Sequence, residues 1–441
     1  MNTDNNVKSV ISIGSMLIIG FALFASFFGA GNLIFPPVIG LAAGKNWIMA
    51  LIGFALSGVL LPILSFVAVV RSGGNEEGIA SDMGRVFSFL FISVIMLCTS
   101  LLIAVPRTAA TTHELGVVTI LGDTEQVWTS CVFFAIVVYL SLNPSTVVET
   151  IGKYLTPALL IIMSVIIVKG ILSPISTPSA GIPDAFRKGF VDGYQTLDVF
   201  GGLVFSGAVF AAVAAHLPGD RRAQMKMAYG CAIVAGLGLL FVYGGLLYLG
   251  ATGSQTLDRE MEHAELIVTL IDQLFRNWGP MALAVATIFA CLTTAIGLTA
   301  GASYFFSRVT KEKLPYKFNV SIICTVSFLF SNLGISAIIG YAVPILVFIY
   351  PTAIVLVLLN VFRCRFFNRG TFLGAAYSTL FFGFLEMLPI LGVKIDVLLS
   401  VMETFPFAEH GFVWAIPAFV CGVIGTVMYK GSGELRVASC E

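Results

Sequence analysis

Apolar residues gather along this chain in long runs that short polar segments separate. A helix that crosses a bilayer needs about 20 apolar residues. By this criterion the pattern predicts about twelve transmembrane helices, with approximate ends at 12–42, 47–70, 84–110, 126–142, 150–173, 187–216, 226–250, 279–307, 318–333, 335–361, 371–392 and 411–430. The prediction is therefore an all-α integral membrane protein with one polytopic domain over 1–441. The polar connection at 252–277 has apolar residues at helical spacing, which predicts a short amphipathic helix over the bundle.

Two of the predicted spans contain residues that interrupt helices. The first holds FASFFGAGNLIFPP at 24–37, and the sixth holds DGYQTLDVFGGLVFSG at 192–207. Glycine and proline unwind or end helices, and unwound backbone at membrane depth must be buried in protein or line a cavity. Helices one and six are equivalent in two five-helix halves, an arrangement typical of inverted-repeat transporters. We expect the second break around Gly201 and Gly202, with Asp198 just before it; the competing interpretation is that these glycines let helices pack closely.

The first break offers partners for both charges of an amino acid. The amides of Ala30 and Gly31 begin a half-helix, whose positive end suits a carboxylate. Carbonyls that unwinding releases suit Na⁺ or an ammonium group. In the eighth span, Thr293 and Thr294 add hydroxyl oxygens, which are hard ligands for an alkali cation. The alternative is that these hydroxyls only bond carbonyls of their own helix.

Ionisable residues at membrane depth are candidates for function. Asp198 can hold a substrate ammonium group, take part in cation binding, or cap a half-helix. Arg107 and Glu114, two turns apart, form a candidate outer gate; the alternative is an interfacial arginine whose head group reaches water. Glu386 lies outside the expected transport core and receives no role. Candidate walls for an aliphatic substrate side chain are Phe27, Phe200, Phe205 and Ile296.

Composition and charge narrow the class of function. Hydrophobic residues make up 58% of the chain and charged residues 11%, against about 25% charged in soluble domains. The formal net charge is zero, which argues against a nucleic-acid partner. Of the 24 Lys and Arg residues, 16 fall on the side of the N-terminus, so both termini are expected in the cytoplasm. The sequence contains no HExxH, GxSxG or P-loop motif, which weighs against an enzyme or an ATP-driven pump.

Four segments together resemble a known family. They are FFGAGNLIFPP at 27–37, VPRTAATTHE at 105–114, GYQTLD at 193–198 and ACLTTAIGLT at 290–299. They are similar to the branched-chain amino acid:cation symporters of bacterial inner membranes. The resemblance implies import of Leu, Ile and Val across the cytoplasmic membrane, with a cation, chiefly Na⁺, as coupling ion and no other cofactor. The implied partners are the amino acid and the lipid bilayer, without an ATPase subunit.

The resemblance also implies the five-plus-five inverted-repeat fold of the bacterial leucine transporter. The repeats would be 12–173 and 187–361, followed by two additional helices at 371–430. That fold implies a Na⁺ site made by the carbonyls of Ala25 and Phe28 with Ala290, Thr293 and Thr294. The substrate-binding candidates are Ser26, Phe27, Ala30, Gly31, Asn32, Asp198, Phe200, Gly201, Gly202 and Phe205. The leucine transporter carries a gate arginine shortly after its Gly-Asn; this chain lacks it, so its outer gate must be built differently.

Three alternatives stay open at this point. A proton-coupled carrier of the same substrates would use Asp198 as its titrating group. A sensor or channel on the same fold would bind amino acids without exchanging them. A membrane-embedded enzyme is the third alternative, although its motifs are missing.

Overall fold

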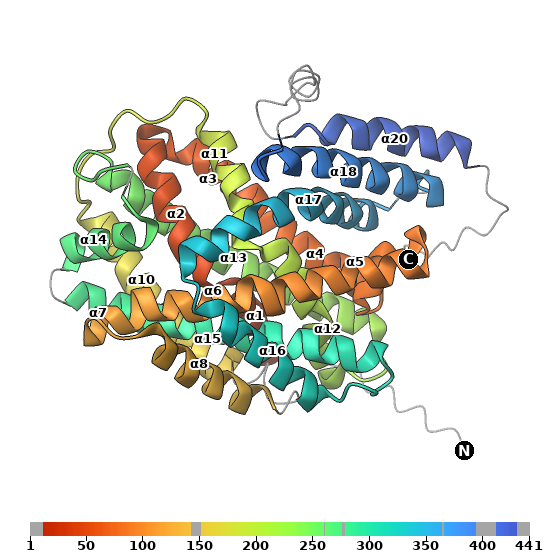
Figure 1. Cartoon of the computed structure of the whole chain (residues 1–441), viewed down its shortest axis with the longest axis horizontal. Coiled ribbons are helices and arrows are strands. Elements are labelled where there is room, and N and C mark those ends of the chain that lie inside the picture. The colour runs from red at the N-terminus through yellow and green to blue at the C-terminus, as the bar shows by residue number, and fades with distance from the viewer. Residues whose placement is uncertain are drawn as a thin grey trace.

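A computed structural model describes residues 12–142, 151–259, 261–275, 278–363, 366–393 and 412–429. Within these ranges every regular element is a helix (Figure 1). Eight helical stretches are long and apolar enough to cross a membrane: Ala30–Arg71, Arg85–Leu121, Lys153–Leu172, Asp198–His216, Arg221–Gly253, Gly279–Val309, Ile335–Val361 and Arg369–Ile390. Four shorter apolar helices are Ile13–Phe27, Gln126–Ser141, Tyr316–Ser331 and Ala415–Met428. Each predicted segment has a helical counterpart, but the count of twelve complete crossings stays a prediction, and residues 150, 411 and 430 lie outside the described ranges.

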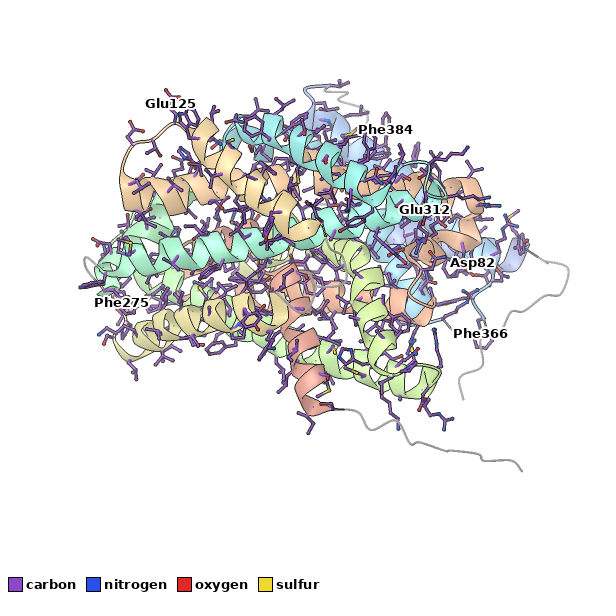
Figure 2. The ribbon with its side chains drawn as sticks, turned by 90° about the horizontal axis from the view of Figure 1, so that it is seen from below. Asp82, Glu125, Phe275, Glu312, Phe366 and Phe384 are labelled. Carbon is purple, nitrogen blue, oxygen red and sulfur yellow. The ribbon has the colours of Figure 1, made fainter. Side chains whose placement is uncertain are left out.

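Within the described ranges, most helices are separated by connections of only a few residues. The α-helices are α1 (Ile13–Phe27), α2 (Ala30–Ala43), α3 (Trp47–Ala55), α4 (Leu61–Arg71), α5 (Arg85–Leu97), α6 (Ala104–Thr111), α7 (Val118–Leu121), α8 (Gln126–Ser141), α10 (Thr156–Leu172), α11 (Ala185–Asp192), α12 (Asp198–His216), α13 (Arg221–Gly253), α14 (His263–Phe275), α15 (Gly279–Val309), α16 (Tyr316–Ser331), α17 (Ile335–Val361), α18 (Arg369–Ile390) and α20 (Ala415–Met428). Shorter helical turns are η1 (Gly44–Asn46), η2 (Leu56–Leu60), η3 (Glu76–Met83), η4 (Cys98–Leu102), η5 (Thr112–Val117), η6 (Ile151–Leu155) and η7 (Gly193–Thr196). Figure 2 shows Glu125 and Phe275 toward one end of the molecule and Asp82 and Glu312 toward the other, so the connections gather at two opposite ends.

The first predicted break is confirmed, between α1 and α2. In a continuous helix the Gly29 amide would donate to the Ala25 carbonyl four residues earlier. Here it donates to the Asn32 Oδ1 at 3.3 Å, which releases the Ala25 carbonyl. The prolines do not end the helix, because Pro36 and Pro37 lie inside α2. Close packing on α13 supports α2 there: a Cβ at Gly250 would overlap the Pro37 carbonyl.

The second break lies earlier than predicted. The chain leaves η7 through Leu197, which adopts the left-handed conformation with φ of 64°, and Asp198 is already the first residue of α12. Gly201 and Gly202 are therefore helical, and the prediction of a break at these glycines is wrong. A Cβ at Gly202 would overlap the Ser65 Oγ and lie 2.9 Å from the Pro62 carbonyl of α4. The glycine thus serves close helix packing, the competing interpretation.

Two other predictions can be compared with the helices. The amphipathic helix is confirmed as α14, which buries Leu266, Ile267, Leu270, Ile271 and Leu274 and packs on α15 and α2. The third span runs past its predicted end at residue 110 and continues to Leu121 through the wider turn η5. Glu114 is consequently part of a helix. Figure 1 shows α17, α18 and α20 side by side at one edge of the bundle.

Candidate functional site

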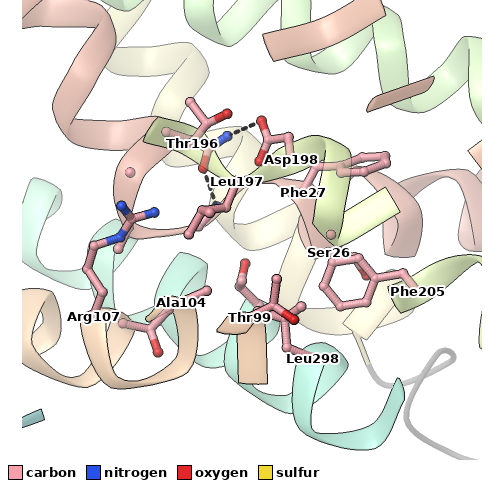
Figure 3. Close-up of a pocket in the computed structure, with 17 residues that line it drawn as sticks. Ser26, Phe27, Thr99, Ala104, Arg107, Thr196, Leu197, Asp198, Phe205 and Leu298 are labelled. Carbon is pink, nitrogen blue, oxygen red and sulfur yellow. Dashed lines mark hydrogen bonds between the residues drawn. The ribbon is translucent and has the colours of Figure 1, made fainter. Parts of the chain in front are cut away.

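A small pocket lies where the two broken helices meet (Figure 3). Its volume is about 20 Å³, enough for about one water molecule. The lining comes from both sides of each break and from the helices η4, α6 and α15: Ser26, Phe27, Gly29, Ala30, Gly31, Asn32, Thr99, Ala104, Arg107, Thr108, Thr196, Leu197, Asp198, Gly201, Phe205, Thr294 and Leu298. Most predicted site residues are thus brought together around one space.

Asp198 is the buried carboxylate of this pocket, with 2% of its surface exposed. The Asn32 Nδ2 donates to its Oδ2 at 2.7 Å, and the Tyr243 hydroxyl donates to the same oxygen at 3.1 Å. Asn32 and Tyr243 also contact each other. Because Asn32 belongs to α2 and Asp198 to α12, the carboxylate joins the two breaks.

The released Ala25 carbonyl faces α15. It accepts hydrogen bonds from the Thr293 hydroxyl at 3.3 Å and from the Thr294 hydroxyl at 3.2 Å. The Thr293 hydroxyl also has the Ala290 carbonyl of its own helix at 2.9 Å and shares its hydrogen between α15 and α1, whereas Thr294 donates to α1. In a continuous helix the backbone N–H of Asn32 would donate to the Phe28 carbonyl. Here it donates to the Gly29 carbonyl at 3.2 Å. The structure therefore gathers three hard oxygen atoms at the first break: the Ala25 carbonyl and the hydroxyls of Thr293 and Thr294.

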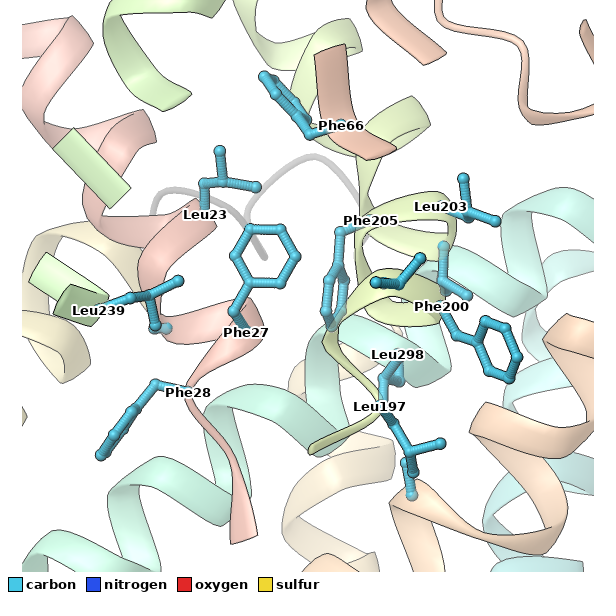
Figure 4. Close-up of a cluster of buried hydrophobic side chains, with 14 of the residues drawn as sticks. Leu23, Phe27, Phe28, Phe66, Leu197, Phe200, Leu203, Phe205, Leu239 and Leu298 are labelled. Atoms are coloured by element: carbon cyan, nitrogen blue, oxygen red, sulfur yellow. The ribbon is translucent and has the colours of Figure 1, made fainter. Parts of the chain in front are cut away.

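The aromatic candidates divide into two groups. Phe27 and Phe205 line the pocket, and their rings meet edge to face with centroids 6.4 Å apart (Figure 4). Phe200 points elsewhere: its ring packs on Tyr350, with centroids 4.7 Å apart. Phe200, Gly202 and Ile296 are absent from the lining of the pocket, although all three are buried.

Arg107 and Glu114 do not meet. The Arg107 Nη1 donates to the Gln195 carbonyl at 2.9 Å, and its guanidinium lies 6.0 Å from the centre of the Phe35 ring. Glu114 accepts from the Ile335 amide at 3.2 Å. Of these two residues, only Arg107 reaches η7, which precedes the second break, and its bond to Gln195 joins α6 to η7.

A second, larger cavity adjoins the pocket on the side of the N-terminal end of α1. Its volume is about 440 Å³. Its walls come from α1, η6, the later part of α12, and α15, and Ser26 and Phe205 line both cavities. The pocket is thus next to a wide space on one side, while Arg107 and Gln195 lie across its other side.

Several residues of the site were missed by the reasoning from sequence. Tyr243 is the most important of them, because it holds Asp198 from α13. A phenol within an apolar span was the available signal, since a buried tyrosine hydroxyl usually has a hydrogen-bond partner. Thr108, Thr196 and Leu298 lie in segments that carry the family resemblance but were not marked singly, and Thr99 lies outside those segments.

The chain is similar to known transport proteins over nearly its full length. The sequence model of the family described as "Branched-chain amino acid transport protein" matches residues 12–432. The branched-chain amino acid permease BraB of Bacillus subtilis is 35% identical, covering 96% of this chain and 97% of the permease. The permease BrnQ of Escherichia coli is 33% identical, covering 97% and 98%. A solved Na⁺-coupled sialic acid symporter in a substrate-bound outward-open state has a TM-score of 0.61 and 15% identity, covering 96% of this chain and 91% of that one. At 15% identity, the similarity to the sialic acid symporter concerns the fold alone. This fold is the leucine-transporter fold that the sequence predicts.

Proposed function

The chain belongs to the branched-chain amino acid transport protein family, and from this premise we propose that it is a secondary active symporter that imports Leu, Ile and Val together with Na⁺. The observation that carries the choice of Na⁺ is the Ala25 carbonyl. It is released from its helix and faces the hydroxyls of Thr293 and Thr294. Neutral oxygen atoms of this kind suit a monovalent hard cation. The Phe28 and Ala290 carbonyls would complete the shell of ligands.

The amino acid would bind in the pocket between the breaks. Asp198 would take the ammonium group, and the amides of Ala30 and Gly31 at the start of α2 would face the carboxylate. Phe27 and Phe205 would enclose the aliphatic side chain. Each methylene is worth about 1–3 kcal/mol in an apolar pocket, so such walls reject Gly and Ala while separating Leu, Ile and Val weakly. Expansion of the small pocket would accompany substrate entry.

Transport would alternate access to this site. Na⁺ would hold α1 against α15, the amino acid would complete the site, and a rearrangement of the broken helices would open it to the wide cavity. That cavity lies on the side of the N-terminus, which the distribution of Lys and Arg predicts to be cytoplasmic in a bacterial inner membrane. A potential of 100 mV supplies about 2.3 kcal/mol per charge, and a tenfold Na⁺ gradient adds about 1.4 kcal/mol. Their sum supports accumulation of roughly a few hundredfold, so no ATPase subunit is needed.

The alternative coupling ion is H⁺, with Asp198 as the titrating carboxylate. Its burial in the pocket is the observation that favours this candidate. A non-transporting amino-acid sensor on the same fold is the alternative to transport itself.

Leucine uptake into proteoliposomes at constant pH tests the proposal. A Na⁺ gradient alone should drive uptake into vesicles, and replacement of Na⁺ by choline should abolish it. Thr294→Ala should weaken the apparent Na⁺ affinity by about tenfold or more, because one oxygen ligand is lost. Thr294→Ser keeps the hydroxyl and is the matched control, expected to stay within about threefold of the unchanged protein.

Each alternative predicts a different outcome. Uptake driven by a pH gradient without any response to Na⁺ would overturn the sodium proposal in favour of H⁺. Binding of leucine without counterflow between inside and outside would favour a sensor.

A further inference from the structure

Arg107 is a buried cation that forms no ion pair with a carboxylate in the described part of the chain. Its exposed fraction is 3%, and it lines the pocket between the two breaks. Its Nη1 donates to the Gln195 carbonyl, whereas its Nε has no hydrogen-bond partner among the residues that the structure describes. Within the same set of residues, no carboxylate oxygen lies within 4.0 Å of the guanidinium. Burial of such a charge is costly unless an anion pairs with it.

The other charge of the pocket does not fill this need. Asp198 lines the same space, but its Oδ2 accepts hydrogen bonds from Asn32 and Tyr243, and neither of its oxygens lies within 4.0 Å of the guanidinium. Figure 3 shows Arg107 and Asp198 approaching the pocket from different helices. The pocket therefore presents one positive and one negative group at separate places, which matches a zwitterion with separated carboxylate and ammonium groups.

Gly31 brings the guanidinium against the start of α2. A Cβ built at Gly31 would lie 2.8 Å from the Arg107 Nη2 and 3.2 Å from the Gln195 carbonyl. The guanidinium consequently occupies the space that a side chain at residue 31 would need. Arg107 and the positive end of α2 act on the same part of the pocket, and each attracts an anion.

We propose that Arg107 binds the α-carboxylate of the transported amino acid, together with the amides of Ala30 and Gly31. The inference rests on the proposed function and deepens it, because it makes Arg107 a substrate-binding residue and not only a residue of the outer gate. Arg107 also contacts Gln195 and Phe35 on the side of the pocket away from the wide cavity. The Arg107 side chain would then bind the carboxylate and also help to close the pocket, on the side away from the wide cavity, over the bound amino acid.

Binding of leucine and of leucinamide to the purified full chain in Na⁺ tests the proposal, because the amide has no carboxylate. The protein should bind leucine much more tightly than leucinamide. Arg107→Gln should weaken leucine binding by about 30-fold or more, as expected for removal of one partner of a buried charge pair. It should leave leucinamide binding within about threefold, so the preference for leucine should collapse. Arg107→Lys keeps the charge and should retain part of the preference.

Arg259→Gln is the matched control. Arg259 also donates to a backbone carbonyl, that of Ala180, but it is exposed and distant in sequence from both breaks. This variant should keep the preference for leucine, and thermal unfolding of each variant checks that it is folded. If Arg107→Gln binds leucine with an unchanged preference over leucinamide, the proposed role of Arg107 is wrong while the proposed transport function stands. If the unchanged protein binds none of Leu, Ile and Val, the proposed function itself fails.

Discussion

At the scale of single residues, the site depends on Asp198. Its carboxylate accepts from Asn32 and Tyr243 and is almost fully buried. These two donors stabilise its charge, and an ammonium group placed beside it would gain a partner that no neutral side chain supplies. The hydrogen bonds fix where that charge stands relative to both breaks.

We predict that Asp198→Asn reduces leucine uptake by about 100-fold or more, because the substrate ammonium would be buried without its counter-charge. Tyr243→Phe removes one donor and keeps the carboxylate, so it should reduce uptake by at most about tenfold. Initial rates in proteoliposomes measure both effects, and thermal unfolding confirms that each variant is folded. Uptake by Asp198→Asn within about threefold of the unchanged protein would exclude Asp198 as the ammonium partner.

The residues of the first break could be predicted from the sequence, because Gly-x-Gly-Asn within an apolar span strongly disfavours a continuous helix. The contacts around Asp198 could not. Asn32 and Asp198 are 166 residues apart, and Tyr243 and Asp198 are 45 apart. No local pattern records such pairs; they follow only from how α2, α12 and α13 pack together.

At the scale of elements, the two breaks differ in how they are made. The first uses Gly29 and the amide side chain of Asn32. The second uses Leu197, a residue that rarely adopts a left-handed conformation. Gly201 and Gly202 gave a stronger signal in the sequence than Leu197, yet they are helical. Glycines that admit a neighbouring helix and glycines that unwind their own helix look alike until the neighbour, here Ser65 of α4, is known.

An ion pair between a buried carboxylate and a partly exposed arginine joins elements near the wide cavity. Glu76 of η3 and Arg308 near the end of α15 are 2.7 Å apart, and the glutamate is 2% exposed. A Cβ at Gly207 of α12 would overlap the Glu76 carboxylate, so α12 lies directly against the pair. The pair therefore lies where η3, α12 and α15 meet, and α12 and α15 both contribute residues to the wall of the cavity, among them Tyr304.

Burial raises the pKa of Glu76 above its usual value of 4.5, Glu77 adds to that rise, and the charge of Arg308 opposes it. A carboxyl with a raised pKa in the folded state binds its proton more tightly there than in the unfolded chain. Its contribution to the free energy of unfolding is therefore largest at low pH and decreases as the pH rises through the raised pKa. Loss of Arg308 would raise the pKa of Glu76 further. The free energy of unfolding would then fall more steeply as the pH rises.

We predict that Arg308→Gln destabilises the protein by about 2 kcal/mol or more at pH 8, and by less at pH 5. Adding Glu76→Gln should remove the difference between the two pH values. Thermal unfolding in detergent measures the effect. Arg363→Gln is the control, because its pair with Asp82 at 3.2 Å is more exposed and should contribute little. An equal loss for Arg308→Gln at both pH values would contradict this account.

At the scale of the whole molecule, the cavities give the fold a direction. The wide cavity lies on the side of the N-terminal end of α1, and the small pocket lies next to it. The positions of Lys and Arg predict that this side faces the cytoplasm. The size of the cavity could not be predicted from sequence, because it depends on the relative tilt of α1, α12 and α15.

We predict that Ala212→Cys, in a background without other cysteines, reacts with an impermeant thiol reagent at least about tenfold faster in inside-out than in right-side-out vesicles, because the residue lines the wide cavity. Ala284→Cys, at a fully buried position of α15, should react slowly in both and is the control. Mass spectrometry of the labelled protein measures the rates. Faster labelling in right-side-out vesicles would reverse the proposed orientation.

Asn32 carries a consequence for the energetics of coupling. Its Oδ1 holds the Gly29 amide away from the Ala25 carbonyl, while its Nδ2 holds Asp198. One side chain thus supports the break that frees a carbonyl of the proposed ion site and also contacts the carboxylate of the proposed substrate site. Any event that strengthens one of its bonds alters the free energy of the other, and linkage makes that effect reciprocal. Na⁺ would then increase the affinity for leucine by the same factor by which leucine increases the affinity for Na⁺, and much of that cooperativity would pass through a single amide group.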